Sequence, residues 1–352
     1  MEIDALLREL SQAHGVSGYE DNVRDIIRRE FESLSDELRA DSMGNLIGLK
    51  RGEPTADTPH RSIMLAAHMD EIGLIVTKLE EGFLRFATVG GIDVRTLPGQ
   101  EVAVHGRMAL RGIIGSRPPH VLPPKNRKKV IPLESLFIDV GLAQADLEDN
   151  VRVGDLITLH SDFAELQGGY VSGKALDDRA GVASLVHCLR SLSSMRCAWD
   201  VFAVATVQEE IGLRGAITSA YGVDPDIAIA IDVDFGRTPG LSEAQSSETG
   251  KGPGIDLGPN VHPVVRQRLV DTAREHEIPF QTSAVPGHSG TDGWAIQVAR
   301  DGVPTALLSI PLRYMHSPVE TVSIRDIDRT GRLMALFAVG LDDRFAAELG
   351  LQ

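Results

Sequence analysis

Two consecutive glutamates, Glu209 and Glu210, follow a nearly pure apolar run at residues 201–207. Apolar runs of this length are typical of strands that are buried on both faces of a largely parallel sheet. Two carboxylates at one buried strand end repel each other and lose hydration, so a compensating cation is expected beside them. One glutamate can then bind a metal ion while its neighbour acts as general base toward a metal-held water.

Three further apolar segments end in side chains that can bind metal ions. They are residues 62–67, followed by His68 and Asp70; residues 227–231, followed by Asp232 and Asp234; and a strand-like segment before residues 314–320, which supplies His316. Because ligands bind beyond the carboxyl ends of the strands in open α/β sheets, we expect these side chains to gather at one edge. A carboxylate at the position of Asp70 can orient the imidazole of His68 by a hydrogen bond.

An aspartate pair, Asp177 and Asp178, opens a helix with an apolar face. Acidic residues also occur at such positions because they suit the positive end of the helix dipole. In the functional interpretation, one of the two carboxylates bridges a pair of metal ions, and the residues themselves leave open which one. Two histidines with several carboxylates form the ligand set of a dinuclear site, against the alternative that strand-end polarity is coincidental.

The elements that must position these residues alternate between strand and helix. Apolar strands are predicted at 62–67, 201–207, 227–231 and 305–309, with helices at about 178–194, 262–276, 292–300 and 325–342. A first helix is predicted from the spacing of Ile3, Leu6, Leu7 and Leu10, and a second from near Ser17, where Ser17 and Glu20 form a capping-box pattern. This alternation predicts an α/β sandwich.

Residues 72–165 have a different pattern, with short alternating segments, frequent Gly and Pro, and no convincing helix. We expect them to form a small β domain inserted into a catalytic α/β domain made of residues 1–71 and 166–352. Residues 117–130 are a proline-rich loop in which four of the five residues 125–129 are Lys or Arg. A solvated mobile loop is the simplest interpretation of that segment.

Composition limits the possible functions. The chain has 352 residues and a formal net charge of -15, which disfavours nucleic acid as the main partner. No apolar stretch approaches the length of about 18 residues that a membrane span needs, so no membrane association is expected. The two cysteines, Cys188 and Cys197, are too few for a disulfide framework, and the amino terminus does not resemble a secretory signal. We therefore expect a cytoplasmic protein.

Six motifs together resemble the tetrahedral (TET) aminopeptidases, a family also described as glutamyl or deblocking aminopeptidases and as cellulase M. In order along the chain they are AAHMDEIG, GGIDVRTLPGQ, GKALDDRAG, TVQEEIGLRGA, GTDGWAIQVARDGVPT and RYMHSPVE. The resemblance covers essentially the whole chain. It implies a three-layer α/β/α metallopeptidase domain, an inserted PDZ-like β-barrel that mediates dimerisation, and dimers that assemble into a twelve-subunit tetrahedron. The basic loop, which includes His120, corresponds to a segment that reaches toward a neighbouring subunit's active site.

The resemblance also implies roles for single residues. One metal ion would be held by His68, Asp177 and Asp232, and the other by Asp177, Glu210 and His316. Asp177 is preferred to Asp178 as the bridging ligand because the family commonly has Asp-Asn-Arg at this motif. Glu209 would be the general base, Asp70 would orient His68, and the cofactors would be two divalent ions, zinc or cobalt and possibly manganese. The implied reaction is hydrolysis of amino-terminal residues from short peptides.

Two departures from the family pattern bear on substrate preference. His288 lies where the family usually has a run of glycines before its Gly-Thr-Asp motif, and Trp294 lies where small residues usually follow the aspartate of that motif. Other functions compatible with the same residues are a metal-dependent deacylase or carboxypeptidase, an endoglucanase using Glu209 and Glu210 as its acid and base, and a non-catalytic shell protein. The glycosidase reading would leave both histidines without a role.

Overall fold

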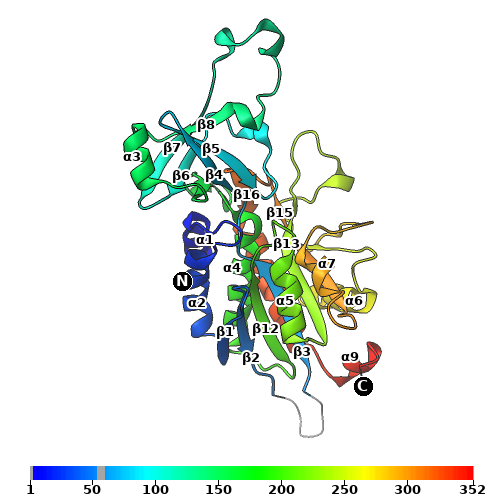
Figure 1. Ribbon diagram of the computed structural model, residues 1–352. Helices are drawn as coiled ribbons and strands as arrows, with labels where there is room; N and C mark the ends of the chain where they lie inside the picture. The colour runs from blue at the N-terminus through cyan, green and yellow to red at the C-terminus, as the bar shows by residue number, and fades with distance from the viewer. Residues whose placement is uncertain (1–2, 54–59, 352) are drawn as a thin grey trace.

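The computed structural model describes residues 3–53 and 60–351, and its larger part is built around a seven-stranded sheet (Figure 1). The strand order is β1-β2-β12-β3-β13-β15-β14. The central strands β12 (Asp200–Thr206), β3 (Ser62–His68), β13 (Ile227–Phe235) and β15 (Thr305–Leu312) run parallel. Strands β1 (Glu37–Ala40), β2 (Leu46–Lys50) and β14 (Gly254–Ile255) extend the two sides with antiparallel pairing. The four apolar runs predicted from the sequence are therefore the four parallel strands.

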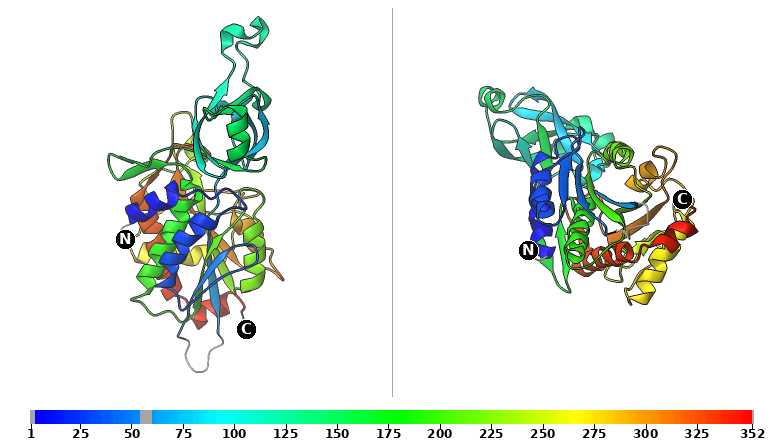
Figure 2. Two further views of the ribbon diagram at one scale, coloured as in Figure 1. Left: turned by 60° about the vertical axis from the view of Figure 1, so that its left-hand side comes forward. Right: turned by 90° about the horizontal axis from the view of Figure 1, so that it is seen from below.

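Helices cover both faces of this sheet and complete three layers (Figure 2). On one face α4 (Leu176–Leu192) packs against the strands and against α1 (Ile3–Gln12), α2 (Asp21–Glu32) and α8 (Ile324–Val339). On the other face α5 (Arg214–Val223) and α7 (Asp292–Ile296) contact each other and the central strands. Two further helices of this part are α6 (Pro263–Glu275), which packs on α8, β14 and β15, and α9 (Asp343–Glu348) near the carboxyl end. Among the described residues no helix is long and apolar enough to cross a membrane.

The second part of the molecule is a closed barrel with its own apolar core, and it lies above the carboxyl edge of the sheet in Figure 1. The strands in order around the barrel are β4 (Gly73–Glu80), β5 (Phe83–Val89), β8 (Leu136–Asp139), β7 (Ala109–Ser116), β6 (Glu101–His105) and β9 (Leu156–Leu159). Side chains alternate along these strands, so that Val102 and Val104 point inward between more exposed neighbours. The segment with the basic residues leaves the barrel as an extended excursion at the top of Figure 1.

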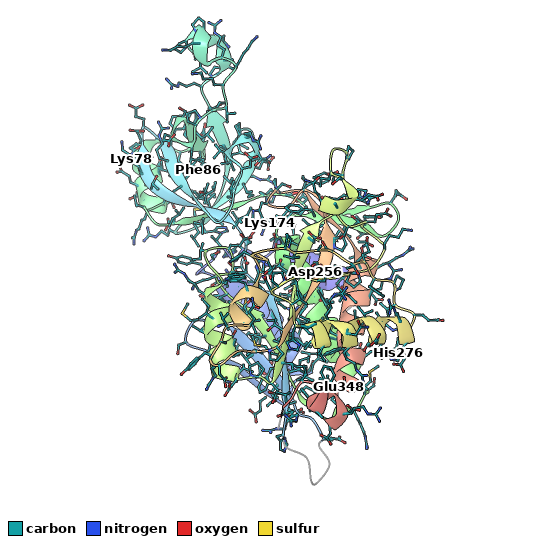
Figure 3. The ribbon with its side chains drawn as sticks, turned by 90° about the vertical axis from the view of Figure 1, so that its right-hand side faces the viewer. Lys78, Phe86, Lys174, Asp256, His276 and Glu348 are labelled. Carbon is teal, nitrogen blue, oxygen red and sulfur yellow. The ribbon has the colours of Figure 1, made fainter. Side chains whose placement is uncertain are left out.

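A small sheet and a buried ion-pair cluster join the two parts. Strand β11 (Tyr170–Gly173) pairs with β10 (Ala164–Leu166) and with β16 (Glu320–Ser323), which precedes α8. Directly after β11, the Lys174 ammonium lies 2.7 Å from a carboxylate oxygen of Glu71, and Arg179 lies 3.4 Å from the other. Figure 3 labels Lys174 at this junction, below the barrel residues Lys78 and Phe86. The cluster thus ties the end of the β3 segment to the start of α4.

This cluster gives a stability prediction. Glu71→Gln should lower the free energy of unfolding by about 3–5 kcal/mol, because it leaves the buried Lys174 ammonium without its carboxylate. Glu165→Gln is the matched control, because its partner Arg8 and Glu165 itself are largely exposed and the loss should stay below about 1 kcal/mol. Urea unfolding of both variants measures the difference. Equal losses in the two variants would refute the structural role of the cluster.

Three local predictions are corrected by the structure. The second helix begins at Asp21, not near Ser17, because the Ser17 hydroxyl donates to Asp70 and the Glu20 carboxylate accepts from the backbone of Gly18 and Gln208 instead of forming a capping box. The helix expected at 292–300 ends at Ile296, because the chain continues in turns: Ala299 N–H donates to the Ile296 carbonyl, Gly302 N–H donates to the Ala299 carbonyl, and φ is positive at Arg300. The β segment also contains a helix, α3 (Gln144–Asn150), which lies against β4.

Candidate metal centre and active site

The predicted site residues come together in one cavity of about 470 Å³ at the carboxyl edge of the parallel strands. Six of them line it: His68, Asp177, Glu209, Glu210, Asp232 and His316. Strand register explains much of the convergence, because Thr206 at the end of β12 is paired with His68 at the end of β3. Asp70, the seventh, is fully buried behind the cavity wall.

Asp177 occupies the centre of the group. Its Oδ1 lies 3.1 Å from Nε2 of His68, and its Oδ2 lies 3.4 Å from Nε2 of His316. The same His316 nitrogen is 3.4 Å from Oε1 of Glu210. Each oxygen of one carboxylate therefore faces a different imidazole, which is the arrangement that a ligand bridging two cations requires.

Both histidines present Nε2 to this centre. Nδ1 of His316 lies 2.6 Å from the carbonyl oxygen of Gly91, and because a carbonyl only accepts, Nδ1 carries the proton and Nε2 is left as a ligand atom. Nδ1 of His68 lies 3.5 Å from Asp70, longer than a good hydrogen bond but on the side predicted for the orienting carboxylate. Gly91 belongs to the segment that follows barrel strand β5, so the barrel part of the chain contacts the candidate metal centre through this hydrogen bond.

Asp70 makes its hydrogen bonds with other groups around the cavity. Its two oxygens accept from the backbone N–H of Glu209 at 3.0 Å and of Glu210 at 3.2 Å, and one also accepts from the Ser17 hydroxyl at 2.6 Å. One buried carboxylate therefore positions the end of β3 against the turn that carries both glutamates.

Three groups of side chains have ligand atoms within 4.8 Å of one another: Asp177 with Glu210 and His316; His68 with Asp178 and Asp232; and His68 with Glu209 and Glu210. The first group is one of the two predicted ligand sets. The second contains Asp178 where the prediction had Asp177, although Asp177 also lies against His68. One oxygen of Asp178 accepts from the backbone of Gly181, and the other is buried without a hydrogen-bond partner among the described residues. A side chain at Gly181 would collide with this carboxylate, which explains the glycine.

The electrostatics of the cavity call for added positive charge. Burial raises the pKa of Glu209 to about 10. The charge of His68 acts to lower this pKa, and the negative charges of Asp232 and other acids act to raise it further. Burial likewise holds the pKa values of Asp178 and Asp232 well above their usual range. Burial also acts to raise the pKa of Asp177, but hydrogen bonds with the two histidines leave it below its usual range. Among the described residues that line the cavity there is no Lys or Arg, so divalent cations fit this mixture of imidazole and carboxylate donors.

Sequence reasoning about single residues missed two supporting groups. Glu320 accepts from the backbone N–H of Asp177 at 3.1 Å and of His316 at 2.8 Å, and so links two candidate ligands. It is the last residue of the RYMHSPVE motif, which was the available signal. Asp292, in the Gly-Thr-Asp motif, accepts from the Thr206 hydroxyl, and burial raises its pKa to about 6.

Comparison with known proteins assigns the chain to a family. A family model described as M42 glutamyl aminopeptidase matches residues 44–333. The chain belongs to the M42 glutamyl aminopeptidase family. It is therefore a peptide-bond hydrolase, and the α/β fold with a closed barrel is the fold of TET aminopeptidases, as the sequence resemblance implied.

Individual members of the M42 family match along nearly the whole chain. The lysyl aminopeptidase of Pyrococcus furiosus is 36% identical over 93% of this chain and 94% of the relative. A TET aminopeptidase structure from the archaeon Thaumarchaeota archaeon SCGC AB-539-E09 is 34% identical, covers 99% of both chains and superimposes with a TM-score of 0.93. The TET1 peptidase of Pyrococcus horikoshii, described as assembling into a tetrahedron or a large octahedral shell, is 35% identical over 97% of this chain and 100% of the other, with a TM-score of 0.85.

Proposed function

We propose that this M42 protein is a metal-dependent aminopeptidase that removes amino-terminal residues from short peptides with two divalent cations and a glutamate base. The observation that carries the proposal is the position of Asp177, whose two oxygens face His68 and His316 in a cavity that also contains Glu209. The proposed reaction is one form of the peptide-bond hydrolysis that the M42 family carries out.

The proposed ligands follow from the distances around Asp177. His68, Asp177 and Asp232 would hold one cation, and Asp177, Glu210 and His316 the other, with Asp178 as an additional donor beside Asp232. Zinc, cobalt and manganese all suit two imidazoles with several carboxylates. When bound, the cations would supply Lewis acidity, which makes a water molecule more acidic and polarises the scissile carbonyl.

Glu209 is the proposed general base. It lines the cavity, is only 9% exposed, and its Oε2 lies 4.0 Å from Nε2 of His68. From that position its carboxylate would take a proton from the attacking water and return it to the leaving amine. Asp70 would keep Glu209 in place through the backbone hydrogen bond described above. The acidic wall of the cavity would attract the free α-ammonium group of the peptide, which accounts for exopeptidase action.

The proposal extends to assembly and location. We propose that residues 72–165 form a dimerisation domain inserted between catalytic segments 1–71 and 166–352, and that dimers assemble into a tetrahedral dodecamer in the cytoplasm. The separate apolar core of the barrel and the shell described for the P. horikoshii relative support the idea. His120 is exposed on the segment that leaves the barrel, away from its own chain's cavity lining, so a role for it would be at a neighbouring subunit.

Metal removal and replacement test the proposed function. We expect chelator-treated protein to lose hydrolysis of aminoacyl-p-nitroanilides, and zinc, cobalt or manganese to restore it. The reason is that the cations would supply the Lewis acidity that activates the attacking water. Release of p-nitroaniline is the measurement. Restored cleavage of acetylated but not free amino termini would favour the deacylase alternative, and activity on carboxymethylcellulose unaffected by chelation would favour the glycosidase.

A further inference from the structure

One acidic side chain in the catalytic cavity has no role in the proposed chemistry. Asp234 lines the same cavity as Glu209 and His316. It lies on β13 two residues beyond Asp232, so both carboxylates are on the same face of the strand, about 6.5 Å apart along it. Asp234 does not belong to any of the three side-chain groups that could hold a metal ion. Asp234 is therefore an acidic side chain that lies beside the proposed metal ligands but is not one of them.

The Asp234 carboxylate is held in place by uncharged groups. Its Oδ1 accepts from the backbone N–H of Phe235 at 2.7 Å, its Oδ2 accepts from the Ser247 hydroxyl at 3.3 Å, and the Ser283 hydroxyl is a third hydrogen-bond partner. Within the described part of the chain no cationic side chain pairs with it, and nearby Arg237 pairs with Glu243 and Glu248 instead. Because a carboxylate offers about four acceptor sites, these three partners leave Asp234 with capacity for about one further donor.

The surroundings of Asp234 suit a long side chain with an apolar stem. Phe235, which also lines the cavity, is 54% exposed. Another part of the wall is His288, whose ring lies 4.1 Å from that of Trp294, centroid to centroid. The two residues that depart from the family pattern thus contact each other, and Trp294 supports the His288 ring at the cavity wall. Aromatic surfaces of this kind accommodate methylene groups and attract cations.

We propose that Asp234 binds the cationic side chain of an amino-terminal lysine or arginine, so that the enzyme prefers basic residues at this position. The inference rests on the proposed aminopeptidase function and adds the substrate class. The α-ammonium group must lie next to the scissile carbonyl and hence near the metal ligands. Asp234 lies one strand repeat farther out, at a distance that the four methylene groups of lysine can span.

Binding of two matched amino acids tests the inference without turnover. Lysine and norleucine differ only in the terminal ammonium group, and calorimetry would measure their affinities for cobalt-loaded protein. We expect lysine to bind about 10- to 100-fold more tightly, the range for a hydrogen bond to a charged group, and Asp234→Asn to remove the difference. Asn is isosteric: its oxygen can still accept from the Phe235 N–H, and its NH2 group can donate to the Ser247 hydroxyl oxygen, which reverses that hydrogen bond. Equal affinities of the unaltered protein for the two ligands, or a preference that survives Asp234→Asn, would overturn the inference.

Kinetics separate this inference from the proposed function. The ratio of kcat/KM for lysyl over leucyl p-nitroanilide should fall about 10- to 100-fold in Asp234→Asn, mainly through KM. The exposed Asp301→Asn is the control and should leave the ratio unchanged. Equal losses on both substrates would show that Asp234 binds the α-ammonium group or acts structurally, and would overturn the inference while leaving the aminopeptidase intact. Inactivity of the unaltered enzyme on every free-amine substrate would count against the proposed function, and the lysine–norleucine comparison would still decide the role of Asp234.

Discussion

Replacement of Glu209 by Gln should abolish most turnover and leave the bound cations in place. Gln has nearly the same size and can keep the backbone hydrogen bond to Asp70, but it cannot take a proton from water. We expect kcat to fall by about 10²–10⁴-fold, the usual contribution of general acid–base catalysis. Metal analysis by mass spectrometry and steady-state kinetics on a p-nitroanilide substrate measure the two properties on the same sample.

The neighbouring glutamate is the matched control for that experiment. Glu210 Oε1 lies 3.4 Å from His316 and faces the proposed second cation, so Glu210→Gln should lower metal content as well as activity. The two substitutions change the same chemical group at adjacent positions and should differ in metal retention. A near-normal kcat in Glu209→Gln, or equal loss of metal in both variants, would contradict the assignment of Glu209 as base.

Replacement of Asp177 by Asn should remove both cations at once. One Asp177 oxygen faces His68 and the other faces His316, and these histidines belong to the two different proposed cation sites. One substitution therefore weakens both sites and removes the carboxylate that the two histidines share. We expect metal content to fall from about two ions per chain to less than one and activity to be lost with it. Metal analysis after dialysis measures how many ions stay bound, and titration with cobalt measures the affinity of the cation sites that remain in the variant.

Asp178→Asn is the comparison that separates the two adjacent aspartates. Asp178 belongs only to the group with His68 and Asp232, and its other oxygen accepts from Gly181. Its replacement should therefore weaken one cation site and spare the site of Asp177, Glu210 and His316. If Asp178→Asn lost both ions while Asp177→Asn kept one, the bridging role would pass from Asp177 to Asp178.

Much of the site could be predicted from the sequence because its signals are local. A run of apolar residues followed by His or Glu requires only that a strand be buried and that its end reach the sheet edge, and β3, β12 and β13 satisfy both conditions. The helices α4, α6 and α8 followed from apolar periodicity in the same way. Helix ends were less predictable because they depend on partners distant in sequence. The Ser17 hydroxyl, for example, donates to Asp70 and so does not cap a helix.

The sequence itself determined the types of the chemical groups, their positions at strand ends and the alternation of strand and helix. These features depend on apolar runs in short segments, which can be recognised without knowing the tertiary structure. Tertiary structure alone decided which groups meet: the barrel closes by pairing β4 with β9, and a carbonyl from Gly91 then sets the proton position on His316. It also brought Glu320 against Asp177 and placed Asp234, which has no cationic partner among the described residues, in the cavity wall. These contacts join residues far apart in the chain, and their geometry depends on how two separate cores pack, which no local pattern encodes.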